Sequence, residues 1–185
     1  ILIEDNRIRE VGRNLAVPEG ATVHDLTDCT VTPGLIDAHV HMQHVDWRTR
    51  NHDAIYRGVA WKSMCILYSA QQILYRGFTA ARSAGSSTTD ARGGLAAKEM
   101  INSGYFPGAR LCITPNYMYD VGSHGDHTQY LRTNPELSIA MAAVTPTSGT
   151  GVELFRHAVR NEIKLGAAYV KMMINGGSHS PNGGQ

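Results

Sequence analysis

The stretch TPGLIDAHVH, residues 32–41, decides how this chain is interpreted. A Pro-Gly turn signal opens it, and a short apolar run then ends in two histidines one residue apart. Alternate residues of a strand point to the same side, so the rings of His39 and His41 are expected to reach one point. Neutral imidazole is a common metal ligand. The competing interpretation is a pair of polar residues at a strand end.

Downstream of this motif, helix-like and strand-like segments alternate. The expected strands cover residues 35–41, 78–82, 109–114 and 167–174, and the expected helices cover residues 53–75, 90–104 and 151–165. Such alternation is typical of parallel βα units and predicts the α/β class. Four strands make half of an eightfold βα barrel, the TIM-like (β/α)8 fold, whose usual size is about 250 residues.

A doubly wound open sheet is the alternative architecture. It requires a glycine-rich, phosphate-binding turn directly after the first strand, and this chain has HVHMQH at residues 39–44 instead. The barrel is therefore preferred. Residues 115–150 are rich in Gly, Ser, Thr, Pro and Asn, and they predict a long irregular loop of the kind that forms lids or binding loops, or is disordered.

The residues before the motif are expected to belong to a different unit. Residues 1–33 are predicted to be part of a small N-terminal β-domain of the β-sandwich type, and residues 34–185 the first half of the barrel, truncated after its fourth strand. Asp5-Asn6 is the predicted turn of an opening hairpin, and residues 17–20 form another turn. Residues 22–26 alternate like a further strand.

Composition excludes several classes of function. Of 185 residues, 42% are hydrophobic and 18% charged, which suits a soluble globular protein. The net charge is +1 and basic residues do not cluster, so neither nucleic acid nor a membrane surface is expected as a partner. Three cysteines, Cys29, Cys65 and Cys112, are far apart and predict buried thiols rather than a disulfide framework.

The ends of the sequence look cut. The chain starts with Ile1 inside a strand-like pattern and stops at Gln185 inside a glycine-rich stretch. The cytoplasm is the favoured location, although a signal peptide preceding Ile1 is compatible with such a sequence. No apolar run approaches the roughly 20 residues that span a bilayer. A homo-oligomer is left open.

Three motifs carry a resemblance to a known family. TPGLIDAHVH resembles the first-strand signature of the amidohydrolase superfamily. YVKMMINGGSHSPNGG, residues 169–184, resembles the fourth strand of its Xaa-Pro dipeptidase and imidazolonepropionase-like branch, and GSHGD, residues 122–126, is similar to a G-G-H-G-D element of that branch. The resemblance covers essentially the whole chain, because the opening hairpins also match the small β-domain of that family.

The resemblance gives Lys171 a specific role. In the family, the equivalent lysine is carboxylated by CO₂ to a carbamate that bridges two metal ions. An ammonium at the end of an apolar strand is costly to desolvate, and nearby cations favour a carbamate anion. Taken alone, Lys171 is better read as an ordinary lysine whose head reaches water. The family motif, with Gly176-Gly177 and Ser180-Pro181 beside it, favours the carbamate.

The implied site is incomplete in this chain. His39, His41 and carboxylated Lys171 are the expected ligands of two Zn²⁺ ions, with manganese, cobalt or iron as alternatives. The family adds two histidines and a general-base aspartate from later strands, beyond Gln185, so this segment alone is not expected to be a competent catalyst. His124 is expected to bind substrate or a developing oxyanion. Asp126 is more consistent with a loop-stabilising role.

The end of the expected strand at residues 78–82 departs from the pattern of the family. Arg82 occupies a position where the family often shows arginine followed by aspartate, and Ser83 replaces that aspartate here. Any salt-bridge role of this strand end is therefore in doubt.

The implied function is a metal-dependent hydrolase in which a metal-activated water cleaves the amide C–N bond of a small substrate, such as a dipeptide or an N-acyl amino acid. Hydrolysis of a cyclic amide, as in imidazolonepropionase, is the second expectation. A non-catalytic scaffold that retains the fold is a third. A nucleotide-binding protein is disfavoured, because neither G-x-x-x-x-G-K nor G-x-G-x-x-G occurs.

Overall fold

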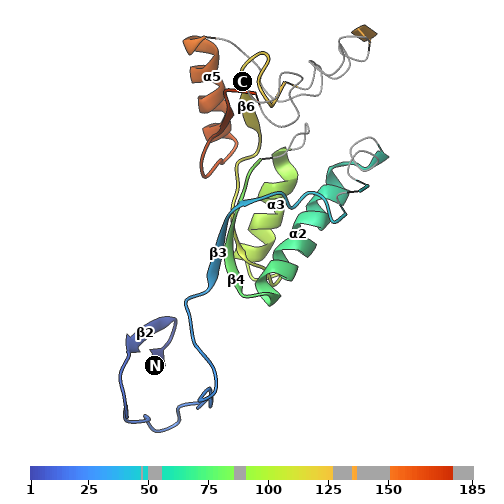
Figure 1. Ribbon diagram of the computed structural model, residues 1–185. Helices are drawn as coiled ribbons and strands as arrows, with labels where there is room; N and C mark the ends of the chain where they lie inside the picture. Colours follow the sequence, from blue (N-terminus) through green and yellow to red (C-terminus); the bar gives the residue numbers. More distant parts are fainter. Residues whose placement is uncertain (47, 50–55, 86–90, 127–134, 137–150, 177–185) are drawn as a thin grey trace. The chain divides into compact units, whose positions relative to one another are not determined.

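The computed structural model describes residues 1–46, 48–49, 56–85, 91–126, 135–136 and 151–176 (Figure 1). Contacts between residues divide the chain into two compact units, Ile1–Pro33 and Gly34–Gln185, which are described separately below. The first residue of the helix expected over residues 90–104 and the glycine- and serine-rich stretch after Gly176 lie outside the described residues.

The first unit contains one hairpin. Strands β1 (Leu2–Glu4) and β2 (Arg7–Glu10) pair antiparallel, and Asp5 adopts a left-handed conformation, with φ 53°, in the turn between them. The hairpin prediction is confirmed. The strand expected at residues 22–26 is wrong: within residues 1–33, all of which are described, it finds no partner strand, and Val23 remains 68% exposed.

A three-stranded parallel sheet forms the centre of the second unit. Its strands are β3 (Leu35–Val40), β4 (Phe78–Ser83) and β5 (Arg110–Cys112), in that order. Helices α2 (Val59–Tyr75) and α3 (Ala91–Asn102) lie side by side against it, as Figure 1 shows. The parallel α/β prediction is confirmed for these elements.

The sheet and the two helices enclose an apolar core. Its buried members come from α2, α3, β4 and β5 and from residues just after β3 and β5: Met42, Ile66, Leu67, Ala70, Ala81, Ala97, Leu111 and Ile113. The glycine of the opening motif allows β3 and β4 to pair closely, because a Cβ on Gly34 would lie 2.2 Å from the side chain of Thr79. Directly after it, the Leu35 amide donates to the Gly77 carbonyl at 2.9 Å.

A second parallel pair follows in sequence. Strands β6 (Tyr117–Tyr119) and β7 (Lys171–Met173) are hydrogen-bonded, and helix α5 (Val152–Lys164) precedes β7. The loop expected from residue 115 onward is wrong at its start, because all three residues of β6 are buried in a strand. Pro115, which lacks an amide donor, lies between β5 and β6. It made the strand after it hard to recognise in the sequence.

The two sheets are joined by backbone and side-chain contacts. The Ala168 amide, ahead of β7, donates to the Ile113 carbonyl just after β5 at 2.8 Å. The carboxylate of Glu162, which is 2% exposed, accepts from the Asn116 amide at 3.0 Å and from Asn116 Nδ2 at 2.8 Å. Helix α5 is thereby anchored to the segment between β5 and β6.

Two composition-based expectations have structural counterparts. The three thiols are free, and Cys65 is buried as expected, whereas Cys29 is exposed, which corrects that part of the prediction. None of the helices in the described ranges combines the length and the hydropathy that crossing a bilayer requires.

Candidate functional site

Strand β3 contains a bulge just before the histidines. Asp37 pairs with Ala81 and Val40 with Ser83, so three steps along β3 match two along β4. The Asp37 carboxylate accepts the His39 amide at 3.0 Å within this bulge. Bulges turn side chains into new directions and are common beside active sites.

After the bulge the strand alternates regularly. Val40 and Met42 pack against the core, so His39 and His41 share the opposite face. Their ring centroids are 5.4 Å apart, at an interplanar angle of 64°. With Zn–N distances of about 2 Å and tetrahedral angles, two imidazoles on one ion have centroids about 5 Å apart. The pair therefore fits a shared metal ion.

The surroundings of His41 lower the pKa of its imidazole. Burial of the partly exposed ring lowers the pKa of His41 below its ordinary value of 6.5, and the positive charges of His39 and Lys171 lower that pKa further, with a smaller effect from His124. A hydrogen bond with the Gly85 backbone opposes these effects. A backbone hydrogen bond that orients the imidazole ring is typical of metal-binding histidines.

These interactions bring all four predicted site residues into one neighbourhood. His39, Lys171 and His124 each lie close enough to His41 to change its pKa. Lys171 opens β7 in register with Tyr117 and is half-buried. The roles assigned to these residues remain predictions. Among the described residues, no group of three or more His, Cys, Asp or Glu side chains is placed to hold a metal ion.

The loop that carries His124 is fastened to the end of β7. The His124 amide donates to the Asn175 carbonyl at 2.9 Å. Asp126, only 6% exposed, accepts the Gly122 amide on Oδ2 at 2.9 Å, and its own amide donates to the Ser123 carbonyl at 3.0 Å. These contacts support the loop-stabilising interpretation of Asp126.

Gly125 leaves no room for a side chain in this loop. A Cβ there would lie 2.5 Å from Tyr119 Cβ and 3.0 Å from Met173 Sδ. We expect Gly125→Ala to cost about 1–3 kcal/mol of stability through overpacking and to displace the neighbouring His124. The control is Gly58→Ala, where a Cβ meets nothing within 4 Å. Thermal unfolding and kcat of the full-length protein measure both effects, and equal behaviour of the two variants would contradict the prediction.

Arg82 has a contact that sequence reasoning did not find. Its Nε donates to the Ala38 carbonyl at 2.7 Å, and its guanidinium carbon lies 5.4 Å from the ring centroid of Tyr169. Burial and the neighbouring Cys112 raise the pKa of Tyr169 to about 12, although Arg82 opposes this shift. Ser83, at the position where the family often has an aspartate, directly follows Arg82 in β4. Its side chain is buried on the face of the strand opposite to that of Arg82.

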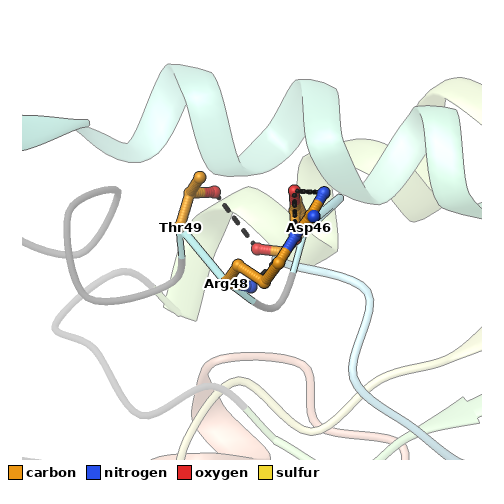
Figure 2. A network of polar contacts seen from close by, with 3 residues as sticks. All are labelled: Asp46, Arg48 and Thr49. Carbon is orange, nitrogen blue, oxygen red and sulfur yellow. Dashed lines mark hydrogen bonds and ion pairs between the residues drawn. The ribbon is translucent and has the colours of Figure 1, made fainter.

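The chain leaving the site is held by a compact turn. Asp46 accepts the Arg48 amide at 2.9 Å and pairs with the Arg48 guanidinium at 2.8 Å, while Thr49 Oγ1 donates to the Asp46 carbonyl at 3.1 Å (Figure 2). The hydrogen bonds from Arg48 lower the pKa of Asp46. Closer to the site, Ser69 Oγ donates to the Met42 carbonyl at 3.2 Å, which fixes the exit of the strand onto α2.

Comparisons with known proteins agree on one class. No family model matches the chain. The structure resembles a crystallised amidohydrolase with a TM-score of 0.75 and 30% identity, over 97% of this chain and 42% of that one. A prolidase in complex with N-methylphosphonate-L-proline gives a TM-score of 0.69 and 28% identity, over 91% of this chain and 40% of that one.

Two further relatives extend this result. A Xaa-Pro dipeptidase with bound methionine gives a TM-score of 0.62 and 25% identity, over 80% of this chain and 35% of that one. A dihydroorotase from Geobacter sulfurreducens is 54% identical over 43 residues, which is 23% of this chain and 10% of that protein. The chain thus spans less than half the length of these relatives. They confirm the predicted resemblance to the amidohydrolase superfamily, and within it to the prolidases and Xaa-Pro dipeptidases.

The lowered pKa of His41 predicts a pH dependence of stability. Below the ordinary value of 6.5, an unfolded chain binds a proton at His41 before the folded chain does. The free energy of unfolding of the metal-free protein should therefore fall as the pH drops from 6.5 to the lower pKa that His41 has in the folded state. Above pH 6.5, His41 should have no effect on the pH dependence of stability. Urea unfolding of the wild type and His41→Asn between about pH 8 and 5 measures the effect. Identical pH profiles would refute the prediction.

Proposed function

We propose that residues 1–33 belong to a small β-domain and that residues 34–185 form the first half of a (β/α)8 barrel. The successive parallel strands and the likeness to crystallised amidohydrolases support this assignment. In such a barrel the carboxyl ends of the strands carry the active site. His39 and His41 lie at the end of β3, in agreement with that arrangement.

We infer that the whole protein is a metal-dependent hydrolase of amide bonds, a small-molecule enzyme with a zinc centre. The observation that carries this proposal is the proximity of His39, Lys171 and His124 to the ring of His41, whose pKa they lower. Two imidazoles with the spacing of a shared ion, next to a lysine in the family's bridging position, form a donor set that suits Zn²⁺.

The residues of this chain have distinct tasks in the proposal. His39 and His41 would hold a metal ion, and Lys171, carboxylated on Nζ, would supply a further oxygen ligand. When bound, such ions polarise a carbonyl group and lower the pKa of water. His124, fixed through its backbone to Asn175, orients the substrate carbonyl. The Gly85 hydrogen bond keeps the His41 ring in a constant orientation.

A dipeptide or an N-acyl amino acid is the proposed substrate. Two of the structural relatives are named for action on proline-containing dipeptides, and one of them was crystallised with a phosphonate derivative of proline. Hydrolysis of a cyclic amide is the second candidate. The 54% identity to a dihydroorotase over 43 residues favours it, because dihydroorotate contains a cyclic amide.

Metal analysis and a substrate panel of the full-length protein test both proposals. We expect about two zinc ions per chain and hydrolysis of Xaa-Pro dipeptides or N-acyl amino acids. Turnover of lactams or dihydroorotate alone would select the second candidate. A protein that binds no metal and hydrolyses none of these compounds would be a non-catalytic scaffold, and the proposal would fall.

A further inference from the structure

We propose that Arg82 is a positioning residue that couples the strand of His39 and His41 to the strand of Lys171. The benefit of this coupling, which is the placement of metal ligands, rests on the metal-dependent function proposed above. The coupling itself is a property of the described contacts. Arg82 lies on β4, whereas Lys171 opens β7 in a different sheet. Hydrogen bonding between neighbouring strands therefore does not relate their positions directly.

The first end of the coupling is the bulge of β3. A bulge leaves its extra residue without a regular ladder partner. Arg82 Nε donates to the carbonyl of Ala38, the residue immediately before His39, at 2.7 Å. The guanidinium thus provides a hydrogen-bond donor for a carbonyl within the bulge. This contact holds the backbone directly before His39 and His41, whose side chains face away from the core.

The second end is the ring of Tyr169. The Arg82 guanidinium lies over this ring, 5.4 Å from its centroid, within the range of about 6 Å for a cation–π contact. Tyr169 lies in a bend two residues before Lys171, the first residue of β7. The buried Tyr169 hydroxyl has no hydrogen-bond partner among the described residues, so the ring face is the part of Tyr169 that contacts Arg82.

Only arginine can make both contacts at once. Its planar guanidinium donates in the plane from Nε while its face stacks on an aromatic ring. Lysine keeps the charge but has neither the Nε–H at that place nor a planar face. Arg82→Lys should therefore behave like Arg82→Met. Tyr169→Phe keeps the ring and should behave like the wild type. Tyr169→Leu removes the ring and should behave like the Arg82 variants.

Hydrogen exchange on the metal-free, full-length protein tests the coupling without reference to metal. We expect Arg82→Met to accelerate amide exchange both in residues 38–41 and in residues 169–173, by roughly threefold to thirtyfold. The matched control is Arg110→Met. Arg110 lies on the adjacent strand β5, paired with Ala80, and the described contacts give its side chain no hydrogen bond or ion pair. It should leave both segments unchanged.

Zinc affinity, measured by competition with a chromogenic chelator, tests the consequence. Arg82→Met, Arg82→Lys and Tyr169→Leu should each weaken binding about 10- to 100-fold, as loss of supporting groups around metal ligands does, with Tyr169→Phe and Arg110→Met at the wild-type value. Exchange confined to residues 38–41, or wild-type affinity in Arg82→Met, would overturn the inference. A wild type that binds no zinc would refute the proposed function, while the exchange experiment would still decide whether Arg82 couples the strands.

Discussion

Replacing Lys171 by methionine in the full-length protein is expected to remove the bridging ligand and to lower kcat/KM by about three orders of magnitude or more. A metal ion supplies several kcal/mol of transition-state stabilisation, and each 1.4 kcal/mol or so corresponds to a factor of ten. Methionine retains the length and the apolar stem but cannot be carboxylated. The metal content should fall from about two ions per chain to one or fewer.

The control for this variant is Lys164→Met on the exposed last turn of α5, which should retain metal and activity. Lys171→Ala adds a chemical test, because a small carboxylic acid entering the vacated space should restore part of the activity if the lysine acts as a carboxylate. A fully active and fully loaded Lys171→Met enzyme would contradict the bridging role. Lys171 would then be an ordinary lysine beside the site and not a metal ligand.

The sequence was sufficient where the determinants are local. The alternation around His39, His41, Val40 and Met42 is set by the period of a strand, so the shared face of the two histidines follows from spacing alone. The glycines and prolines that end the elements are local signals in the same sense, and the hairpin turn at Asp5 was found in this way. These features required no knowledge of the tertiary structure.

The sequence was insufficient where the determinants are distant contacts. The hydrogen bond from Arg82 to Ala38 spans 44 residues, and those between Asn116 and Glu162 span 46. No periodicity in the sequence encodes such pairs. Strand β6 was missed for the same reason, because a three-residue strand is defined by its partner and its burial rather than by a pattern of its own. The bulge in β3 likewise depends on its register with β4.

Removing the carboxylate of Glu162 is expected to destabilise the described core strongly. Glu162→Ala leaves two donors of Asn116 without their acceptor at a buried site, and an unsatisfied buried donor costs about 1–3 kcal/mol. The expected loss is about 2–4 kcal/mol of the free energy of unfolding, or roughly 5–15 °C in Tm. Urea unfolding of the full-length protein, with an unchanged m-value, measures it.

Two matched variants decide whether this loss comes from the hydrogen bonds. Glu153→Ala removes a carboxylate from the same helix, but its partner Arg156 is exposed, so the change should cost no more than about 0.5 kcal/mol. Glu162→Gln keeps the volume and one acceptor, so it should lie between Glu162→Ala and the wild type. Asn116 immediately precedes Tyr117, whose register partner is Lys171. If Glu162 anchors β6, Glu162→Ala should therefore also weaken zinc binding, whereas a loss confined to stability would show that the β6–β7 pair holds Lys171 without help from α5.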